Sequence, residues 1–133
     1  MKVVIDTNVL VSGTFYSGVP CRIIQAWREN RFQLVISTDI FVEYQRVMGV
    51  LAMVHPSVEI STVLNYIAEN AVIFEVPLLA QKVCEDRDDD KFLACALASG
   101  SKLIVSGDKH LLKVSGYQRI KVVKPREFVE RYL

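Results

Sequence analysis

Short apolar runs recur along the chain, and longer stretches of mixed character separate them. The first run, Val3-Val4-Ile5, stops at Asp6, and the later runs have a similar length. Continuous apolar runs of a few residues, several of them rich in β-branched side chains, are typical of strands covered on both faces of a sheet. The pattern therefore predicts five strands, at residues 2–5, 32–36, 71–76, 103–105 and 120–123.

The stretches between these runs carry apolar residues at helical spacing. Several also carry residues that start or stop helices: Pro20 and Pro125 suit a first turn, Ser37 suits a cap, and Gly100 suits a C-terminal stop. Serine–glycine pairs within residues 12–18 predict turns there. Helices are expected at about 20–30, 39–53, 57–70, 79–84, 90–99 and 125–132.

Strands that alternate with helices predict an α/β fold, in which a parallel sheet has helices on both faces and right-handed crossovers. No linker composition interrupts the 133 residues, so one domain is expected over residues 1–133. In such folds ligands bind beyond the carboxyl ends of the strands, where the strand order reverses. Residues that follow the strands directly are therefore the first candidates for a functional site.

The composition, with 51% hydrophobic and 23% charged residues, is that of a folded globular protein. No apolar run approaches the roughly 18 residues that cross a bilayer, and the N-terminus lacks the pattern of a secretion signal. The three cysteines, Cys21, Cys84 and Cys95, fit neither a disulfide framework nor a zinc site, and Cys95 is expected to pack in the core. A cytoplasmic location is the expectation.

Positive charge is concentrated at the end of the chain. The formal net charge is only +1, yet residues 102–133 carry eight lysines and arginines against three acidic residues. A basic end beside an acidic site would suit a polyanionic substrate. A solvated surface is the alternative, and charge alone does not decide between them.

Acidic residues stand at the ends of the predicted strands. Asp6 follows the first strand directly, and Asp108 follows the fourth after a short turn. If these two strands are neighbours, both carboxylates face one crevice. Asp89 begins the helix that precedes the fourth strand, but its side of the sheet does not follow from the sequence.

Glu43 shares the inward stripe of its predicted helix, three residues after Ile40 and four before Val47. A carboxylate on such a stripe costs several kcal/mol unless it is paired or bound to a metal. No basic residue lies at helical spacing on the stripe, because Arg46 points toward a neighbouring edge. A cation in the cleft is therefore expected beside Glu43.

Each acidic residue also has a structural interpretation. Asp6 and Asp108 could turn the chain, residues 88–90 could cap a helix, and Glu43 could reach the helix edge. Taken together, clustered carboxylates stay ionised only if a cation compensates them. Oxygen ligands without cysteine or histidine indicate Mg²⁺ or Mn²⁺, as one or two ions, and such ions support phosphodiester hydrolysis.

These residues resemble the motifs of the PIN domain family over nearly the whole chain. The opening stretch Val4-Ile5-Asp6-Thr7-Asn8-Val9-Leu10 is similar to the first motif, and Glu43 stands where the family has a helix-borne glutamate. Two later stretches, residues 86–98 and 103–112, resemble its later motifs. Each piece is short, but their order and spacing together are specific.

The resemblance implies a three-layer α/β/α sandwich with strand order 3-2-1-4-5 and a metal-dependent ribonuclease, often the toxin of a toxin–antitoxin pair. It implies an antitoxin partner and a homodimer. The acidic positions match Asp6, Glu43, Asp89 and Asp108, and the supporting polar positions match Asn8 and Ser106.

Within the acidic run, Asp89 is chosen over Asp88 and Asp90 because it lies eleven residues before Gly100, the spacing that the family usually shows. Related chains often have Asn at the position of Asp90, and many have Thr at the position of Ser106.

Two other functions compete with the nuclease. A haloacid dehalogenase-like phosphatase would use Asp6 as nucleophile, but it needs a second aspartate where Asn8 stands. A catalytically silent module that binds RNA or protein is the second alternative, although all four acids are present. His55 and His110 are interpreted as surface or packing residues, with His110 near enough to Asp108 to touch a substrate.

Overall fold

The computed structural model describes residues 1–133 and contains one sheet of five parallel strands in the order β3-β2-β1-β4-β5. In the register, Val4 lies opposite Ile104 of one neighbouring strand, and Lys2 lies opposite Gln33 of the other. The strand order and the parallel direction confirm the predicted α/β fold. The strands are β1 (Lys2–Ile5), β2 (Gln33–Ser37), β3 (Val72–Phe74), β4 (Leu103–Val105) and β5 (Lys121–Val123).

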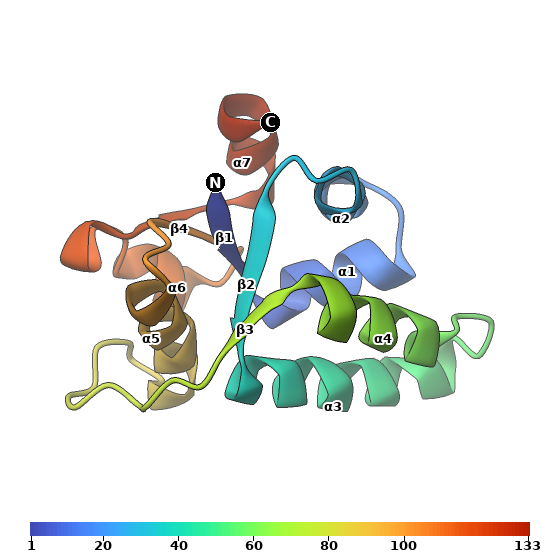
Figure 1. The fold of residues 1–133 in the computed structure, drawn as a ribbon, viewed down its shortest axis with the longest axis horizontal. Coiled ribbons are helices and arrows are strands. Elements are labelled where there is room, and N and C mark those ends of the chain that lie inside the picture. The colour runs from blue at the N-terminus through green and yellow to red at the C-terminus, as the bar shows by residue number, and fades with distance from the viewer.

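Helices cover both faces of this sheet. Figure 1 shows α5 and α6 on one side and α1 and α2 on the other, while α3 and α4 run together away from the sheet. No helix combines the length and the apolar character needed to cross a bilayer. The helices are α1 (Thr7–Phe15), α2 (Val19–Arg28), α3 (Thr38–Val54), α4 (Ile60–Asn70), α5 (Asp90–Ser99), α6 (Lys109–Lys113) and α7 (Pro125–Tyr132), with 3₁₀ turns η1 (Arg87–Asp89) and η2 (Tyr117–Arg119).

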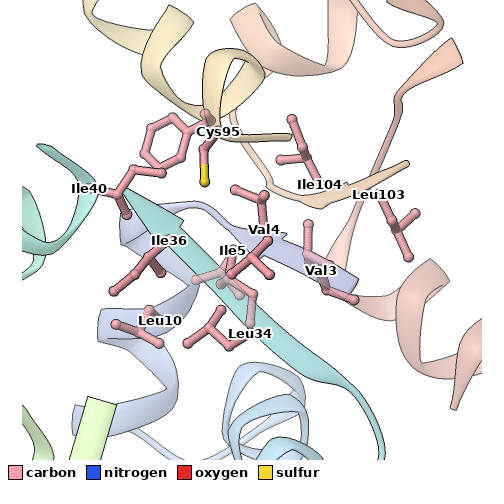
Figure 2. Packing of buried hydrophobic residues seen from close by; sticks show 14 of the residues in the cluster. Val3, Val4, Ile5, Leu10, Leu34, Ile36, Ile40, Cys95, Leu103 and Ile104 are labelled. Carbon is pink, nitrogen blue, oxygen red and sulfur yellow. The ribbon is translucent and has the colours of Figure 1, made fainter. Parts of the chain in front are cut away.

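The core lies on both faces of β1, the central strand. Val3, Val4 and Ile5 are fully buried. In Figure 2, Cys95 of α5 reaches the sheet from one side and Leu10 of α1 from the other. Cys95 is a free, buried thiol, which agrees with its predicted packing role. Two covered faces explain why the strands are continuous apolar runs rather than alternating ones.

The predicted helix signals act as expected. The Ser37 hydroxyl caps α3 by accepting a hydrogen bond of 3.1 Å from the Ile40 amide. Gly100 ends α5 with a φ of +76°, a conformation that glycine adopts without steric cost. Pro20 and Pro125 both stand in the first turn of a helix. These local signals determine where α2, α3 and α7 begin and where α5 ends.

The helix α1 was not predicted, because turns were expected within residues 12–18. Its buried residues face several directions, so it shows no amphipathic period. A Cβ atom on Gly13 would lie 2.6 Å from the Pro20 carbonyl oxygen, so this glycine lets α1 and α2 cross closely. The Ser12–Gly13 pair is therefore part of a helix, whereas the turn predicted at Ser17–Gly18 is confirmed: both residues connect α1 to α2, and Gly18 has a φ of +118°.

Two further predictions differ from the structure. The helix expected over 79–84 is wrong, since these residues form bends without helical hydrogen bonding. The short helix α6 was missed: it has five residues, and the Asp108 side chain caps it by accepting from the His110 amide at 2.7 Å. Five residues are too few for a hydrophobic period to stand out.

Candidate active site

Asp6 lies immediately beyond β1, at the carboxyl edge of the sheet. Its amide donates a hydrogen bond of 2.9 Å to the Val105 carbonyl, so the pairing of β1 with β4 extends to this residue. The side chain is buried, with 6% of the residue exposed. Ser106 directly follows β4, the strand beside β1, and it is also buried. Its amide donates a hydrogen bond to the Val123 carbonyl of β5.

The Ser106 hydroxyl links the two aspartates that follow the neighbouring strands. It donates a hydrogen bond of 2.6 Å to Oδ2 of Asp6 and accepts one of 2.9 Å from the Asp108 amide. Because β1 and β4 are adjacent and parallel, Asp6 and Asp108 leave the sheet at the same edge. Asp6 and Asp108 therefore lie at one edge of the sheet, as the sequence predicted for neighbouring strands, and the Ser106 hydroxyl bridges them.

Asp89 also lies at this edge, although it comes from a different segment of the chain. It ends η1 and directly precedes α5, and its Oδ2 lies 3.8 Å from Nδ1 of His110. The same Nδ1 lies 3.8 Å from Oδ1 of Asp108. One ligand atom from each of Asp89, Asp108 and His110 falls within 4.8 Å of the others. The sequence left the side of Asp89 open, and the structure brings it to Asp108.

His110 was interpreted as a surface or packing residue, but it completes this cluster. It also lies 3.6 Å from Glu85 through Nε2. The signal that could have found it is its spacing: it stands two residues after Asp108, in the first turn of the helix that Asp108 caps. A capping residue and the residue two positions later are close in space.

Burial and mutual repulsion raise the pKa values of two of these acids. Burial raises the pKa of Asp89 to about 6, with further contributions from the charges of Asp108, Asp86 and Asp6. Burial also raises the pKa of Asp6, where the hydrogen bond from Ser106 opposes the charges of Asp108 and Glu43. Both shifts reflect the cost of ionising carboxyl groups that are buried and close to other acids.

Glu43 has a partner that the sequence did not suggest. Lys91 of α5 lies 2.5 Å away, measured from Nζ to Oε1, and its Nζ also lies 3.1 Å from Asp88. The Thr7 hydroxyl donates a hydrogen bond to the other oxygen, Oε2. Arg46, which was expected to point toward a neighbouring edge, also lies 4.0 Å from Oε1 of Glu43. Burial of Glu43 alone therefore no longer argues for a bound cation, since Lys91 of another helix supplies a counter-charge that spacing along α3 cannot reveal.

Asp90 and Asp88 have structural roles instead. Asp90 is buried and accepts hydrogen bonds of 3.0 and 2.7 Å from the amides of Val83 and Cys84. These bonds lower its pKa although burial acts in the opposite direction. Asp88 is exposed and pairs with Lys91. The choice of Asp89 within the acidic run thus agrees with where the three side chains lie.

Asn8 is the sequence candidate that the structure does not bring into this cluster. It is exposed on α1 and forms no hydrogen bond with the four acids. Beside Glu43 a hollow of about 300 Å³ opens toward solvent. Arg46, Lys91 and Asp39 contribute to its lining, so a positively charged side chain stands next to the acidic edge.

The donor set fits a hard divalent cation. Asp6, Asp89 and Asp108 offer carboxylate oxygens at one edge, two of them with raised pKa values, and no lysine or arginine pairs with these three. Oxygen-rich sites of this kind select Mg²⁺ or Mn²⁺.

Comparisons with known proteins agree with this geometry. The PIN domain model matches residues 2–110, which include all four acids and His110. The chain is also 29% identical to an uncharacterized protein of Methanocaldococcus jannaschii, over 99% of this chain and 92% of that protein. The chain therefore belongs to the PIN domain family, whose members are typically divalent-metal-dependent nucleases that act on nucleic acid.

Proposed function

We propose that residues 1–133 form one ribonuclease domain that hydrolyses RNA phosphodiester bonds with Mg²⁺ or Mn²⁺. Asp6, Glu43, Asp89 and Asp108 are its metal-binding and catalytic residues, and Asn8 and Ser106 support them. One observation carries the proposal: three carboxylates converge at the carboxyl edge of the sheet, while the fourth, Glu43, already has its lysine. A divalent cation at this edge would compensate the three carboxylates, which repel one another when they are ionised together.

Asp6, Asp89 and Asp108 would hold the metal, and Glu43 would complete the site directly or through water. A bound Mg²⁺ or Mn²⁺ supplies activation of water and stabilisation of phosphoryl oxygens. The Ser106 hydroxyl orients Asp6, and Lys91 with Thr7 orients Glu43. Arg46 lines the neighbouring hollow, lies 4.0 Å from Glu43 and is largely exposed, so it could also contact a phosphate. Water oxygen would replace the 3′ oxygen on phosphorus, leaving a 5′-phosphate and a 3′-hydroxyl.

The test is cleavage of labelled single-stranded RNA by the pure protein with Mn²⁺. Asp6→Asn, which keeps the shape of the side chain, should abolish cleavage, and so should EDTA. Glu69→Gln is the matched control, because Glu69 is an exposed carboxylate on α4. It should cleave like wild type. Equal cleavage by wild type and Asp6→Asn would assign the activity to a contaminant and contradict the proposal.

A phosphatase would instead release phosphate from a phosphomonoester, so a phosphomonoester substrate is included. Hydrolysis of that substrate together with intact RNA would favour the phosphatase. Binding of RNA without cleavage by the wild type would favour the silent binding module. Parallel incubation with single-stranded DNA separates a ribonuclease from a general nuclease.

The toxin role is a separate proposal that rests on the family. A toxin with an antitoxin partner should arrest growth when it is expressed alone, and co-expression of the antitoxin should restore growth. Glu43→Gln should abolish the arrest if it depends on nuclease activity. A homodimer is part of the same proposal, and the mass in solution measures it.

A further inference from the structure

A second hollow lies at the opposite edge of the sheet from the acids. Its volume is about 650 Å³, and residues at the amino ends of β1, β4 and β5 line it. In Figure 1 this edge lies at the top, near the N-terminus and α7. We call it the amino-edge hollow, and the lining residues that matter here are Lys2, Ser101, Lys102, Arg119, Lys121 and Tyr132.

The amino-edge hollow carries positive charge without compensation. Four of its lining residues are lysine or arginine, and none of its lining residues is acidic. None of these four cations has a carboxylate within ion-pair distance, whereas Lys91, Lys113 and Arg131 all do. Lys2 donates instead to the Ser99 carbonyl at 2.9 Å. A concave surface lined by one sign of charge concentrates counter-ions of the opposite sign.

The amino-edge hollow shows where some of the basic residues within 102–133 lie. Of the eight basic residues within 102–133, Lys102, Arg119 and Lys121 gather in this hollow rather than beside the acidic edge. These three residues therefore lie at the opposite edge of the sheet from the acids, so this part of the basic end does not stand beside the acidic site. A separate anion-binding surface explains their grouping better than solvation of scattered charges does.

Arg119 is held toward the hollow by an unusual backbone. Gln118 and Arg119 have φ values of +50° and +66°, in the left-handed region that residues other than glycine rarely adopt. Two backbone hydrogen bonds at Gly116 close the turn: its amide donates to Ile120 at 2.7 Å, and its carbonyl accepts from Arg119 at 3.0 Å. Strained backbone of this kind persists where the surrounding structure fixes it, and it clusters at functional sites.

An aromatic ring stands among these cations. Tyr132 of α7 lines the hollow and is partly exposed. The Phe128 ring lies nearly parallel to it, with the two ring centres 5.8 Å apart. Grooves that combine lysine and arginine with an aromatic platform are typical of surfaces that bind single-stranded nucleic acid, since bases stack on the ring. A site for free phosphate would not need the ring.

We propose that the amino-edge hollow binds the backbone of single-stranded RNA, with a base against Tyr132. The proposal rests on the proposed function, because it assigns this surface to the same substrate class. Asp6 follows Lys2 by four positions along β1, which corresponds to about 13 Å through the buried strand at about 3.3 Å per residue.

The test measures RNA affinity in EDTA, where metal-dependent cleavage cannot occur, so its result does not depend on nuclease activity. Fluorescence anisotropy with a labelled oligouridine gives the affinity of the full chain between about 50 and 200 mM salt. Lys102→Gln/Lys121→Gln removes two cations of the hollow. Arg22→Gln/Lys82→Gln removes two exposed, unpaired cations elsewhere and keeps the net charge equal.

If the hollow binds RNA, the first pair should weaken binding about tenfold at 0.1 M salt and reduce the salt slope by about 1.4, and the control pair should change neither. Tyr132→Leu should weaken binding about fivefold and leave the slope unchanged. Equal losses in both pairs would mean that only net charge matters and would overturn the proposal. Competition by inorganic polyphosphate with no effect of Tyr132→Leu would also overturn it, in favour of a simple anion site.

Discussion

Lys91 of α5 and Glu43 of α3 form an ion pair, with Nζ 2.5 Å from Oε1, and this pair ties the two helices together at the acidic edge of the sheet. Both side chains are largely buried, with 11% and 14% exposed. Burial lowers the pKa of Lys91, but hydrogen bonds and charge from Glu43 and Asp88 outweigh burial and raise it overall. The lysine therefore stays charged, and Glu43 differs from the other three acids in having a fixed counter-charge.

Replacement of Lys91 by methionine should destabilise the protein. Glu43 would lose its buried counter-charge and keep only the exposed Arg46, 4.0 Å away, and the loss of one member of a buried pair costs about 3 kcal/mol. Urea unfolding measures the free energy of unfolding. The double variant Lys91→Met/Glu43→Gln should recover at least half of the loss, because no unpaired charge remains.

The control for Lys91→Met is an ion pair in solvent. Arg131 lies 3.8 Å from Glu127 on α7, and both side chains are exposed. Arg131→Met should change the free energy of unfolding by less than about 0.5 kcal/mol. A loss from Lys91→Met no larger than this would show that the Glu43 pair adds nothing to stability.

The Asp89→Asn variant should be more stable than wild type in the absence of metal at pH 7.5. Burial and the charge of Asp108 raise the pKa of Asp89 from 3.8 to about 6, so ionised Asp89 destabilises the folded state. Because this pKa is raised in a carboxyl group, the penalty grows as pH rises from about 4 to 6 and is complete above 6. Since solvent screens part of the shift, we expect a gain of about 1 kcal/mol.

The gain should disappear near pH 4, where the folded protein holds Asp89 protonated. Thermal unfolding at both pH values measures it. Saturating Mn²⁺ should raise the melting temperature of wild type more than that of Asp89→Asn, because bound metal relieves the repulsion that the variant lacks. A variant less stable than wild type at pH 7.5 would contradict the destabilising role of Asp89.

Much of the fold could be predicted from the sequence, because its signals are local. Runs such as Val3-Val4-Ile5 have two covered faces, and Gly100 and Ser37 act within one helical turn. The helix α1 could not be predicted this way, since its buried residues surround the axis. The strand order 3-2-1-4-5 followed from the family resemblance, and the alternation of elements predicted only a parallel sheet.

Only part of the candidate site could be predicted, because several of its contacts join distant segments of the chain. Asp6 and Asp108 stand directly after strands, so their convergence follows from the direction of the sheet. The Lys91–Glu43 pair and the approach of His110 to Asp89 join segments far apart in the chain. Contacts of this kind depend on how α3, α5 and α6 pack, which periodicity does not describe.

We expect Asp90 to stabilise the fold and to take no part in catalysis, in contrast to Asp89. Asp90→Ala would leave the amides of Val83 and Cys84 without an acceptor and should cost about 3 kcal/mol of stability. Asp90→Asn keeps one acceptor oxygen for the two amides and leaves the other amide unpaired, so it should cost about 2 kcal/mol. The native hydrogen bonds lower the Asp90 pKa below 3.8 despite burial, so its stabilisation is present above that pH and is lost as pH falls through the lowered pKa.

The measurement for Asp90 pairs urea unfolding with the RNA cleavage rate under folded conditions. Asp90→Asn should retain wild-type cleavage, whereas Asp89→Asn should lose it. Loss of cleavage in a fully folded Asp90→Asn protein would assign Asp90 to the catalytic set and contradict its structural role.

Ser106 should control metal affinity through Asp6. Its hydroxyl donates to Asp6 and accepts from the Asp108 amide, so Ser106→Ala would release both groups from their register. Because that hydrogen bond opposes the rise of the Asp6 pKa, its loss should raise this pKa further and favour the protonated carboxyl, which binds metal poorly. Removal of a hydrogen-bond partner that orients a ligand costs about 10- to 100-fold in metal affinity.

Titration with Mn²⁺, followed by electron paramagnetic resonance, measures that affinity directly. Ser106→Thr should restore most of the affinity because the hydroxyl returns. A Ser106→Ala protein with wild-type affinity would mean that Asp6 is oriented by the backbone alone.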